Sequence, residues 1–531
     1  MLRTLHQRAE TVFVLVLLWK AALLVFTAQP IPANDSFFYD GAVVNYLLHG
    51  QYCNPAIANA LPVSGNEVFS AYPPLYQLML LGWMKLFGTS VLAAMWLHFV
   101  LFAIFAALVL ATLRVLGVPV WCAHIAGAFL LGLTWHDRPD SLAQVFGMTA
   151  VFATARASGG TTGTSGRKQA SGWAWLAALG VVLCFCTSLQ IGGIYFALAW
   201  LATLLSCRLH GASTPWPALA VMTLVPVALL FAVKTFWPHL WAGFQEHARQ
   251  TPSFTSWRRP SIAELLKILR TAPGVILALA LLPATLKRWR QADLGELALL
   301  VAASATSAAV LGGALFFLTP NLVANAAYLQ PLVVGVFLAL LAGRVMTENR
   351  LAVMRACFGL AIVLVSVRAI GLTTFGVACA MDVSERAARQ SVTRELSRAP
   401  DHATVGVSAA YLYDAWPQQT RLKLLHCDWL GPLKRNQPAA EFDNFVAAKP
   451  SVLVLTQFDY YRRYEAWLRR LQTLPNAAKV RVENSAQVQP PDASPRWQRV
   501  VQHVSWAPVI VMLEWSANEP NAALDNRFGR E

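Results

Sequence analysis

A polar segment near the N-terminus contains acids and no bases. Residues 29–72 have no Lys or Arg, although the whole chain has a net charge of +15. They carry the acids Asp35, Asp40 and Glu67. A carboxylate beside a cavity can act as a general base that takes a proton from a hydroxyl group. Asn34 or Asp35 could instead cap the N-terminus of a helix, which is a structural role, so both roles stay open at this point.

A second group of charges is the sequence HDRPDSLA at residues 136–143. Asp137 and Asp140 are further candidate catalytic carboxylates, and Arg138 is a candidate ligand for an anion. Pro139 suits the first turn of a helix. The structural alternative for Asp140 is that it interacts with the positive end of that helix and pairs with Arg138.

A third group is basic and lies in residues 237–261. Arginine binds phosphate oxygens through two parallel N–H donors, so a cluster of arginines next to a membrane predicts a phosphate site. Attraction to lipid headgroups, or pairing with Glu246, is the structural alternative. The candidate ligands of this phosphate are Arg138, His247, Arg249, Arg258 and Arg259.

The elements that must position these residues are membrane-spanning helices. Hydrophobic residues make up 56% of the 531 positions, charged residues make up 13%, and the mean hydropathy is +0.48. In a typical soluble domain about 25% of the residues are charged. Apolar stretches of about 18 residues or more can cross a membrane. We predict about eleven such helices, near 11–28, 90–113, 119–135, 139–156, 172–189, 191–207, 217–237, 271–286, 295–318, 325–343 and 352–379.

Basic residues are unevenly distributed between the predicted helices. If the N-terminus is cytoplasmic, the cytoplasmic connections before residue 380 hold most of the Lys and Arg, which is the positive-inside pattern. The positive charge is then a consequence of topology, and we expect no nucleic-acid partner. An odd number of helices places residues 380–531 outside. The sequence predicts an integral protein of the plasma membrane, which in bacteria is the inner membrane.

Residues 380–531 are less apolar than the rest and predict a small extracytoplasmic α/β domain. We expect amphipathic helices at 382–398 and 459–474, and strands at 404–408, 451–458, 480–484 and 509–515. No glycine-rich phosphate loop follows the first strand, which argues against a nucleotide site. The predicted fold class is therefore a polytopic α-helical membrane protein with two domains. They are a transmembrane module, 1–379, with outer loops 29–89 and 238–270, and the soluble domain, 380–531.

Several motifs together resemble the GT-C superfamily of membrane glycosyltransferases. They are an acidic first loop with the patterns D-x-x-x-Y and LLxGxY, the sequence YPPLY before a short apolar helix ending in LFG, and RPDxLA. The resemblance covers about residues 10–345. It is strongest to the group that contains the protein O-mannosyltransferases, the aminoarabinose transferases and the rhizobial lipopolysaccharide galacturonosyltransferases. It implies a polyprenyl-phosphate-linked sugar donor and an inverting transfer on the outer face of the membrane.

The resemblance also implies roles for particular residues. Asp35 matches the first-loop acid, which is the catalytic base, and Asp137 or Asp140 matches the second acidic position. Two features depart from the family. Ser36 follows Asp35 where the family has an Asp-Glu pair, and NAAYLQPLVV at 325–334 lacks the arginine of the family's RYxLP segment. The residues expected to line the substrate cavity are Tyr39, Tyr72, Tyr76, Tyr328 and Gln330.

We therefore expect a hexosyl or pentosyl transferase whose partners are membrane lipid, the lipid-linked donor and a lipid, glycan or protein acceptor. Arginines can neutralise the leaving phosphate, and no His/Cys spacing resembles a zinc site, so we expect neither a metal nor a cofactor. The alternatives are a flippase or transporter of lipid-linked sugars and a non-catalytic subunit of cell-envelope assembly. Polar residues gather in outer loops rather than at mid-membrane, which favours the transferase over the transporter.

Overall fold

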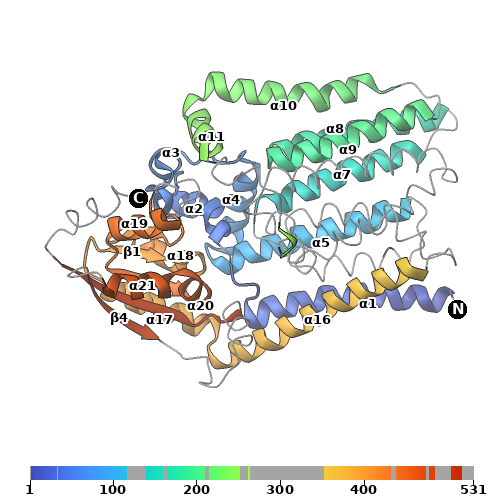
Figure 1. The fold of residues 1–531 in the computed structure, drawn as a ribbon. Helices are drawn as coiled ribbons and strands as arrows, with labels where there is room; N and C mark the ends of the chain where they lie inside the picture. Colours follow the sequence, from blue (N-terminus) through green and yellow to red (C-terminus); the bar gives the residue numbers. More distant parts are fainter. Residues whose placement is uncertain are drawn as a thin grey trace. The chain divides into compact units, whose positions relative to one another are not determined.

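The computed structural model describes residues 2–32, 34–115, 123, 138–159, 164–209, 214–250, 261–263, 352–431, 438–473, 478–484 and 504–516. The chain divides into two compact units (Figure 1). The helical unit consists of Met1–Ala22, Ser70–Leu80 and Met95–Gly371. The sheet unit consists of Leu23–Phe69, Leu81–Ala94 and Leu372–Glu531.

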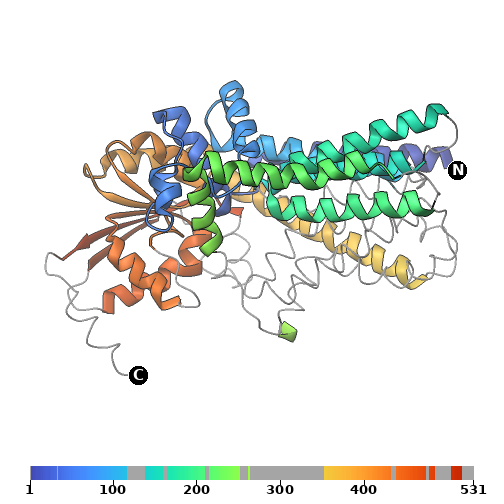
Figure 2. The same ribbon diagram turned by 90° about the horizontal axis from the view of Figure 1, so that it is seen from above.

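Four helices run side by side in the helical unit (Figure 2). They are α7 (Asp140–Gly159), α8 (Thr164–Phe185), α9 (Leu189–Leu209) and α10 (Trp216–Phe236). Small residues let the first three of these helices approach closely, as is common between helices in a membrane. A Cβ atom at Gly147 would lie 2.0 Å from the ring of Tyr195, and one at Gly180 would lie 2.8 Å from the carbonyl oxygen of Phe146.

Four of the described helices are long and apolar enough to cross a membrane. They are Glu10–Thr27, Val91–Val115, Leu189–Arg208 and Trp216–Phe236, which match predicted spans. The predicted spans at 139–156, 172–189 and 352–379 are also helical, as α7, α8 and α16 (Ala352–Asp382). The predicted spans at 119–135, apart from residue 123, and at 271–286, 295–318 and 325–343 lie outside the described residues. The total of about eleven spans therefore stays a prediction.

Two further helices belong to the outer segments predicted from the sequence. The short apolar helix after the two prolines is confirmed as α4 (Leu75–Phe87), and Gly88 follows it with a φ of 90°, a conformation that suits glycine. The segment after α10 begins with a shorter amphipathic helix, α11 (Pro238–Gln250).

The sheet unit contains five strands in the order β2-β1-β3-β5-β4. Strand β1 (Thr404–Val407) is parallel to β2 (Lys423–His426) and β3 (Val452–Thr456). Strand β5 (Pro508–Trp515) is antiparallel to β3 and to β4 (Ala478–Asn484). All four predicted strands are confirmed. Strand β2 was not predicted, because four residues that begin with a lysine are too short to show a period of two.

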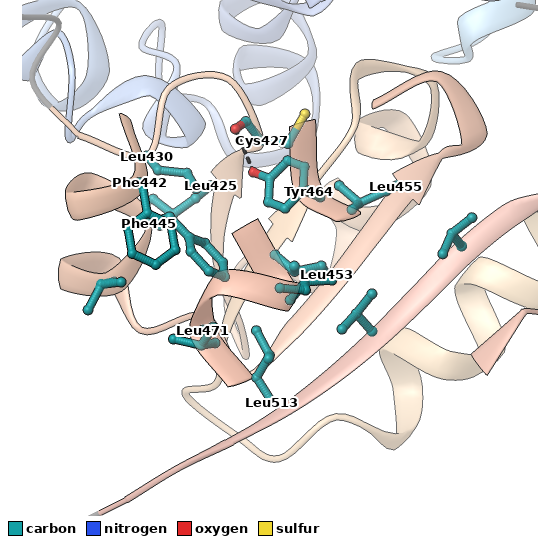
Figure 3. Close-up of a cluster of buried hydrophobic side chains, with 14 residues drawn as sticks. Leu425, Cys427, Leu430, Phe442, Phe445, Leu453, Leu455, Tyr464, Leu471 and Leu513 are labelled. Carbon is teal, nitrogen blue, oxygen red and sulfur yellow. Dashed lines mark hydrogen bonds between the residues drawn. The ribbon is translucent and has the colours of Figure 1, made fainter. Parts of the chain in front are cut away.

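Helices pack on this sheet, and those between residues 438 and 473 enclose an apolar core against it. The helices are α17 (Glu385–Arg398), α18 (Ala409–Ala415), α19 (Pro438–Ala448), α20 (Gln457–Asp459) and α21 (Glu465–Thr473), with a π-helical turn at Tyr460–Tyr464. The predicted helix at 382–398 is confirmed, and Ser384 caps α17 by accepting a hydrogen bond from the backbone N–H of Ala387. Figure 3 shows the core, where Leu453, Phe445 and Tyr464 meet and the Tyr464 hydroxyl donates to the carbonyl oxygen of Cys427 at 2.7 Å.

The acidic first loop forms helices that belong to the sheet unit. They are α2 (Asn34–His49), a 3₁₀ turn (Pro55–Ile57) and α3 (Pro62–Asn66). The ring of Phe37 in α2 contacts Tyr413 at 5.2 Å and Trp416 at 4.9 Å between ring centroids. The compact unit thus contains more than residues 380–531, and the domain boundary at residue 380 stays a prediction.

Candidate functional site

Helix α2 carries both acids of the first loop. Asp35 is its second residue and Asp40 is its seventh. Residues five apart in an α-helix point in directions that differ by roughly 140°. Asp35 is described by this helix position alone, and the first turn of a helix is a favourable place for a negative charge.

Asp40 is held inside the sheet unit. It is buried, and the hydroxyl of Tyr413 in α18 donates a hydrogen bond to its Oδ2 atom at 2.8 Å. Five residues further along α2, Asn45 Oδ1 accepts a hydrogen bond from Trp416 Nε1 at 3.3 Å. These contacts give Asp40 a part in holding α2 against α18.

Four predicted site residues meet in the helical unit. Arg138 Nε lies 3.3 Å from Asp140 Oδ2, and Arg138 Nη2 donates to the Tyr72 hydroxyl at 3.4 Å. The ring of Tyr72 lies against that of His247 in α11, with 5.8 Å between centroids. Asp140 is also the first residue of α7, so its charge meets the positive end of that helix as well. We call Tyr72, Arg138, Asp140 and His247 the arginine cluster.

Three polar side chains connect this cluster to the interior. The hydroxyl of Tyr76 in α4 lies 2.9 Å from Nε2 of His98, which belongs to α5 (Val91–Val115). Nδ1 of His98 lies 3.0 Å from Oγ of Ser141 in α7. Ser141 Oγ donates in turn to the carbonyl oxygen of Arg138 at 2.9 Å. Tyr76 and His98 are fully buried. Tyr76 was expected to line the substrate cavity, and its described hydrogen bond is to the ring of His98.

Sequence reasoning missed His98 and Ser141. His98 is one polar residue in the apolar stretch AAMWLHFVLF, and Ser141 lies within the HDRPDSLA motif beside residues with more obvious chemistry. A signal existed, because a polar side chain in an apolar helix needs a buried hydrogen-bond partner.

The other predicted site residues are placed as follows. Tyr39 is buried in α2, where its ring contacts Phe38 at 4.8 Å. Arg249 lies in α11 and is described by its helix position alone. The residues Asp137, Arg258, Arg259, Tyr328 and Gln330 lie outside the described part of the chain, so their roles stay predictions.

The described residues contain no group of three or more His, Cys, Asp or Glu side chains that could hold a metal ion. The expectation of a reaction without metal or cofactor stays a prediction. The cationic groups of the arginine cluster are Arg138 and, when protonated, His247, and both can interact with an anion.

A separate buried polar group lies at the carboxyl ends of the parallel strands. Ser408 follows β1, Thr456 ends β3, and their hydroxyls donate to Oδ2 of Asp459 at 2.5 and 2.8 Å. Burial, and then the nearby charge of Asp428, raise the pKa of Asp459 from 3.8 to about 6. The hydrogen bonds from Ser408 and Thr456 limit this rise in pKa, because they stabilise the ionised carboxylate.

No protein-family model matches the sequence, and no curated protein matches it. Solved structures do match. The oligosaccharyltransferase of Archaeoglobus fulgidus in complex with Zn and sulfate aligns with a TM-score of 0.53 at 12% identity, over 86% of this chain and 69% of that one. The same protein tethered to an acceptor peptide aligns with a TM-score of 0.51 at 10% identity, over 87% and 71% of the two chains.

A second protein aligns over nearly the full length of both chains. ArnT from Cupriavidus metallidurans, bound to undecaprenyl phosphate, covers 94% of this chain and 97% of its own at 13% identity, but its TM-score of 0.48 is too low to establish a common fold. The likeness to the oligosaccharyltransferase exceeds that level over most of this chain. The chain therefore shares the fold of that oligosaccharyltransferase, and this likeness agrees with the resemblance of its sequence motifs to the GT-C superfamily.

Proposed function

We propose that the protein is a membrane glycosyltransferase that moves a sugar from a polyprenyl-phosphate donor to an acceptor hydroxyl on the extracytoplasmic face, with inversion. The observation that carries the proposal is the arginine cluster. Tyr72, Arg138 and His247 come from three distant parts of the sequence and lie together. Arg138 and His247 were expected to bind the donor phosphate, and Tyr72 was expected to line the substrate cavity. The GT-C fold supports this reaction class.

The leaving group of this reaction is a lipid phosphate. Its negative charge grows as the bond to the sugar breaks, so cations placed beside it lower the barrier. We assign this role to Arg138, which Asp140 and Tyr72 orient, with His247 beside them. Arg249, Arg258 and Arg259 are proposed as further phosphate ligands from the basic segment.

The acceptor hydroxyl needs a base. The bond that forms joins the acceptor oxygen to the anomeric carbon of the sugar, the bond that breaks joins that carbon to the phosphate, and the base takes the acceptor proton. Asp40 already accepts a hydrogen bond from Tyr413, which favours Asp35 as the base. Asp137 and Asp140 are the remaining candidates, and Asp140 is paired with Arg138.

The role of Arg138 can be tested by replacing it with glutamine. Loss of one charge-assisted contact costs about 1.5–3 kcal/mol, so the KM for the lipid-linked donor should rise roughly 10- to 150-fold. Arg156→Gln is a matched control, because Arg156 lies in the last turn of α7, the helix that begins two residues after Arg138, and contacts the rings of Phe152 and Trp173.

The control should leave the donor KM unchanged. An unchanged donor KM in Arg138→Gln would place the phosphate elsewhere. The measurement is sugar transfer by purified protein in detergent or vesicles. If vesicles that contain the wild-type protein moved the lipid-linked sugar across the membrane without transferring it, the transporter would replace the transferase as the proposal.

A further inference from the structure

We infer that Tyr76, His98 and Ser141 form a directed chain of hydrogen bonds that positions Arg138 for the donor phosphate. The inference rests on the proposed function of Arg138. These three are positioning residues, because they act through the backbone of Arg138 and not on the reacting atoms.

The direction of the chain follows from what each group can donate. The carbonyl oxygen of Arg138 only accepts, so the hydroxyl proton of Ser141 points to it. Ser141 Oγ must then accept from Nδ1–H of His98. In a neutral imidazole this leaves Nε2 as an acceptor, and the Tyr76 hydroxyl donates to it. One arrangement of protons therefore satisfies these three hydrogen bonds.

The chain connects three helices to one turn. Tyr76 belongs to α4, His98 to α5 and Ser141 to α7. The turn is the segment Arg138–Asp140, whose first carbonyl oxygen also accepts from the backbone N–H of Ser141 at 3.1 Å. Side chains on packed helices hold a geometry more tightly than side chains on loops do. The chain thus transmits the fixed geometry of the helices to the turn that carries Arg138.

The exposure of the residues along this hydrogen-bond chain supports a positioning role. Tyr76 and His98 are 0% exposed and Ser141 is 7% exposed, whereas the side chains of Arg138 and Asp140 are 14% and 16% exposed. The polar contacts therefore run from the interior to the place where the protein becomes accessible. Apolar residues would pack the same interior without the desolvation cost of polar groups, so the hydrogen bonds need another reason to be there.

A double-mutant cycle tests the chain. Tyr76→Phe removes the first donor, and Ser141→Ala removes the bond to the Arg138 carbonyl. The probe is a sugar-free polyprenyl phosphate in detergent micelles, and the readout is its Kd. Each single variant should weaken binding by about 2- to 12-fold, the usual effect of one hydrogen bond. Tyr76 and Ser141 are linked only through His98 in this chain, so coupling between them is the specific signature.

The expected result is that the double variant binds no more weakly than the worse single variant. Thr112→Val is the control, because Thr112 lies in α5 with His98 and its buried hydroxyl donates to the carbonyl oxygen of Leu108 at 2.8 Å. It removes a comparable hydrogen bond away from the arginine cluster and should leave the Kd unchanged. A purely structural role would lower the unfolding temperature of all these variants without changing the Kd.

A second pair of variants tests His98, the central residue of the hydrogen-bond chain. Asn at position 98 keeps an N–H donor near the place of Nδ1, whereas Leu keeps only bulk. His98→Asn should therefore bind the polyprenyl phosphate more tightly than His98→Leu. Equal Kd values in this pair would argue that the imidazole contributes packing alone and would overturn the inference.

The outcomes separate this inference from the proposed function. If Arg138→Gln loses binding while Tyr76→Phe and Ser141→Ala bind as the wild type does, the chain does not position Arg138 and the proposed function stands. If Arg138→Gln itself binds normally, the phosphate lies elsewhere, and both the proposed site and the positioning chain are wrong.

Discussion

Five positions separate Asp35 from Asp40 in α2, and this spacing turns them in directions roughly 140° apart. Asp40 points into the sheet unit, where Tyr413 donates to it. Asp35 lies in the first turn of the helix. The sequence indicated both acids as candidates for the catalytic base. It did not show which one has a structural partner, because Tyr413 lies 373 positions after Asp40.

The first prediction concerns this pair. Asp35→Asn keeps the shape of the side chain and removes its basicity, so transfer should fall by roughly 10²–10⁴-fold while donor binding and membrane insertion are retained. Asp40→Asn should reduce transfer less. The measurement is the turnover of purified variants at saturating donor. Near-normal turnover in Asp35→Asn, with loss in Asp40→Asn, would reassign the base to Asp40. Activity in both variants would leave Asp137 and Asp140.

The second prediction concerns Asp459. Its pKa in the folded protein is about 6 and its ordinary value is 3.8, so the unfolded chain loses this proton at lower pH than the folded protein does. The stability contributed by this group is therefore present below pH 4 and is lost as the pH rises to about 6. The loss is on the order of 3 kcal/mol.

Asp459→Asn should remove this loss. The unfolding temperature of the variant, relative to the wild type, should rise between pH 4 and pH 7. Asp443→Asn, at an exposed position in α19, is the control and should show no such change. A constant difference between Asp459→Asn and the wild type over this range would show that the carboxyl group titrates normally.

At the scale of the elements, local sequence patterns predicted most of the helices and strands in the described residues. Strands such as VLVLT and the amphipathic helix before them follow from the residues alone. The contacts between elements did not follow. Arg138 and Tyr72 are 66 residues apart, and nothing in either motif indicates that they meet. His98 escaped notice because its partners, Tyr76 and Ser141, lie on two other helices.

The third prediction concerns how α2 is held on α18. Tyr413→Phe removes the hydroxyl that donates to Asp40 and leaves a buried carboxylate with one donor fewer, which costs about 1–3 kcal/mol. Backbone amides of α2 should then exchange hydrogen faster. Tyr460→Phe, in the π-helical turn, removes a hydroxyl from another part of the same unit and is the control. Unchanged exchange in α2 of Tyr413→Phe would mean that the aromatic contacts of Phe37 suffice.

At the scale of the whole molecule, charge asymmetry predicts orientation. Tags after residues 165 and 290 should be cytoplasmic, and a tag at the C-terminus should be extracytoplasmic, because Lys and Arg are concentrated in the predicted cytoplasmic connections. Protease added to intact spheroplasts should remove the C-terminal tag alone. A protected C-terminal tag would reverse the orientation and move the proposed reaction to the other side of the membrane.

The long separation between α2 and α18 also has a consequence in time. Ribosomes add about 5–20 residues per second, so the 373 residues between Asp40 and Tyr413 correspond to roughly 20–75 s of synthesis. A similar delay applies to Asn45, because its hydrogen-bond donor, Trp416, is synthesised 371 residues later. The helix that carries the proposed base is thus made among the first and docked among the last. A nascent chain released before Tyr413 is made contains Asp35 but lacks the surface that holds α2.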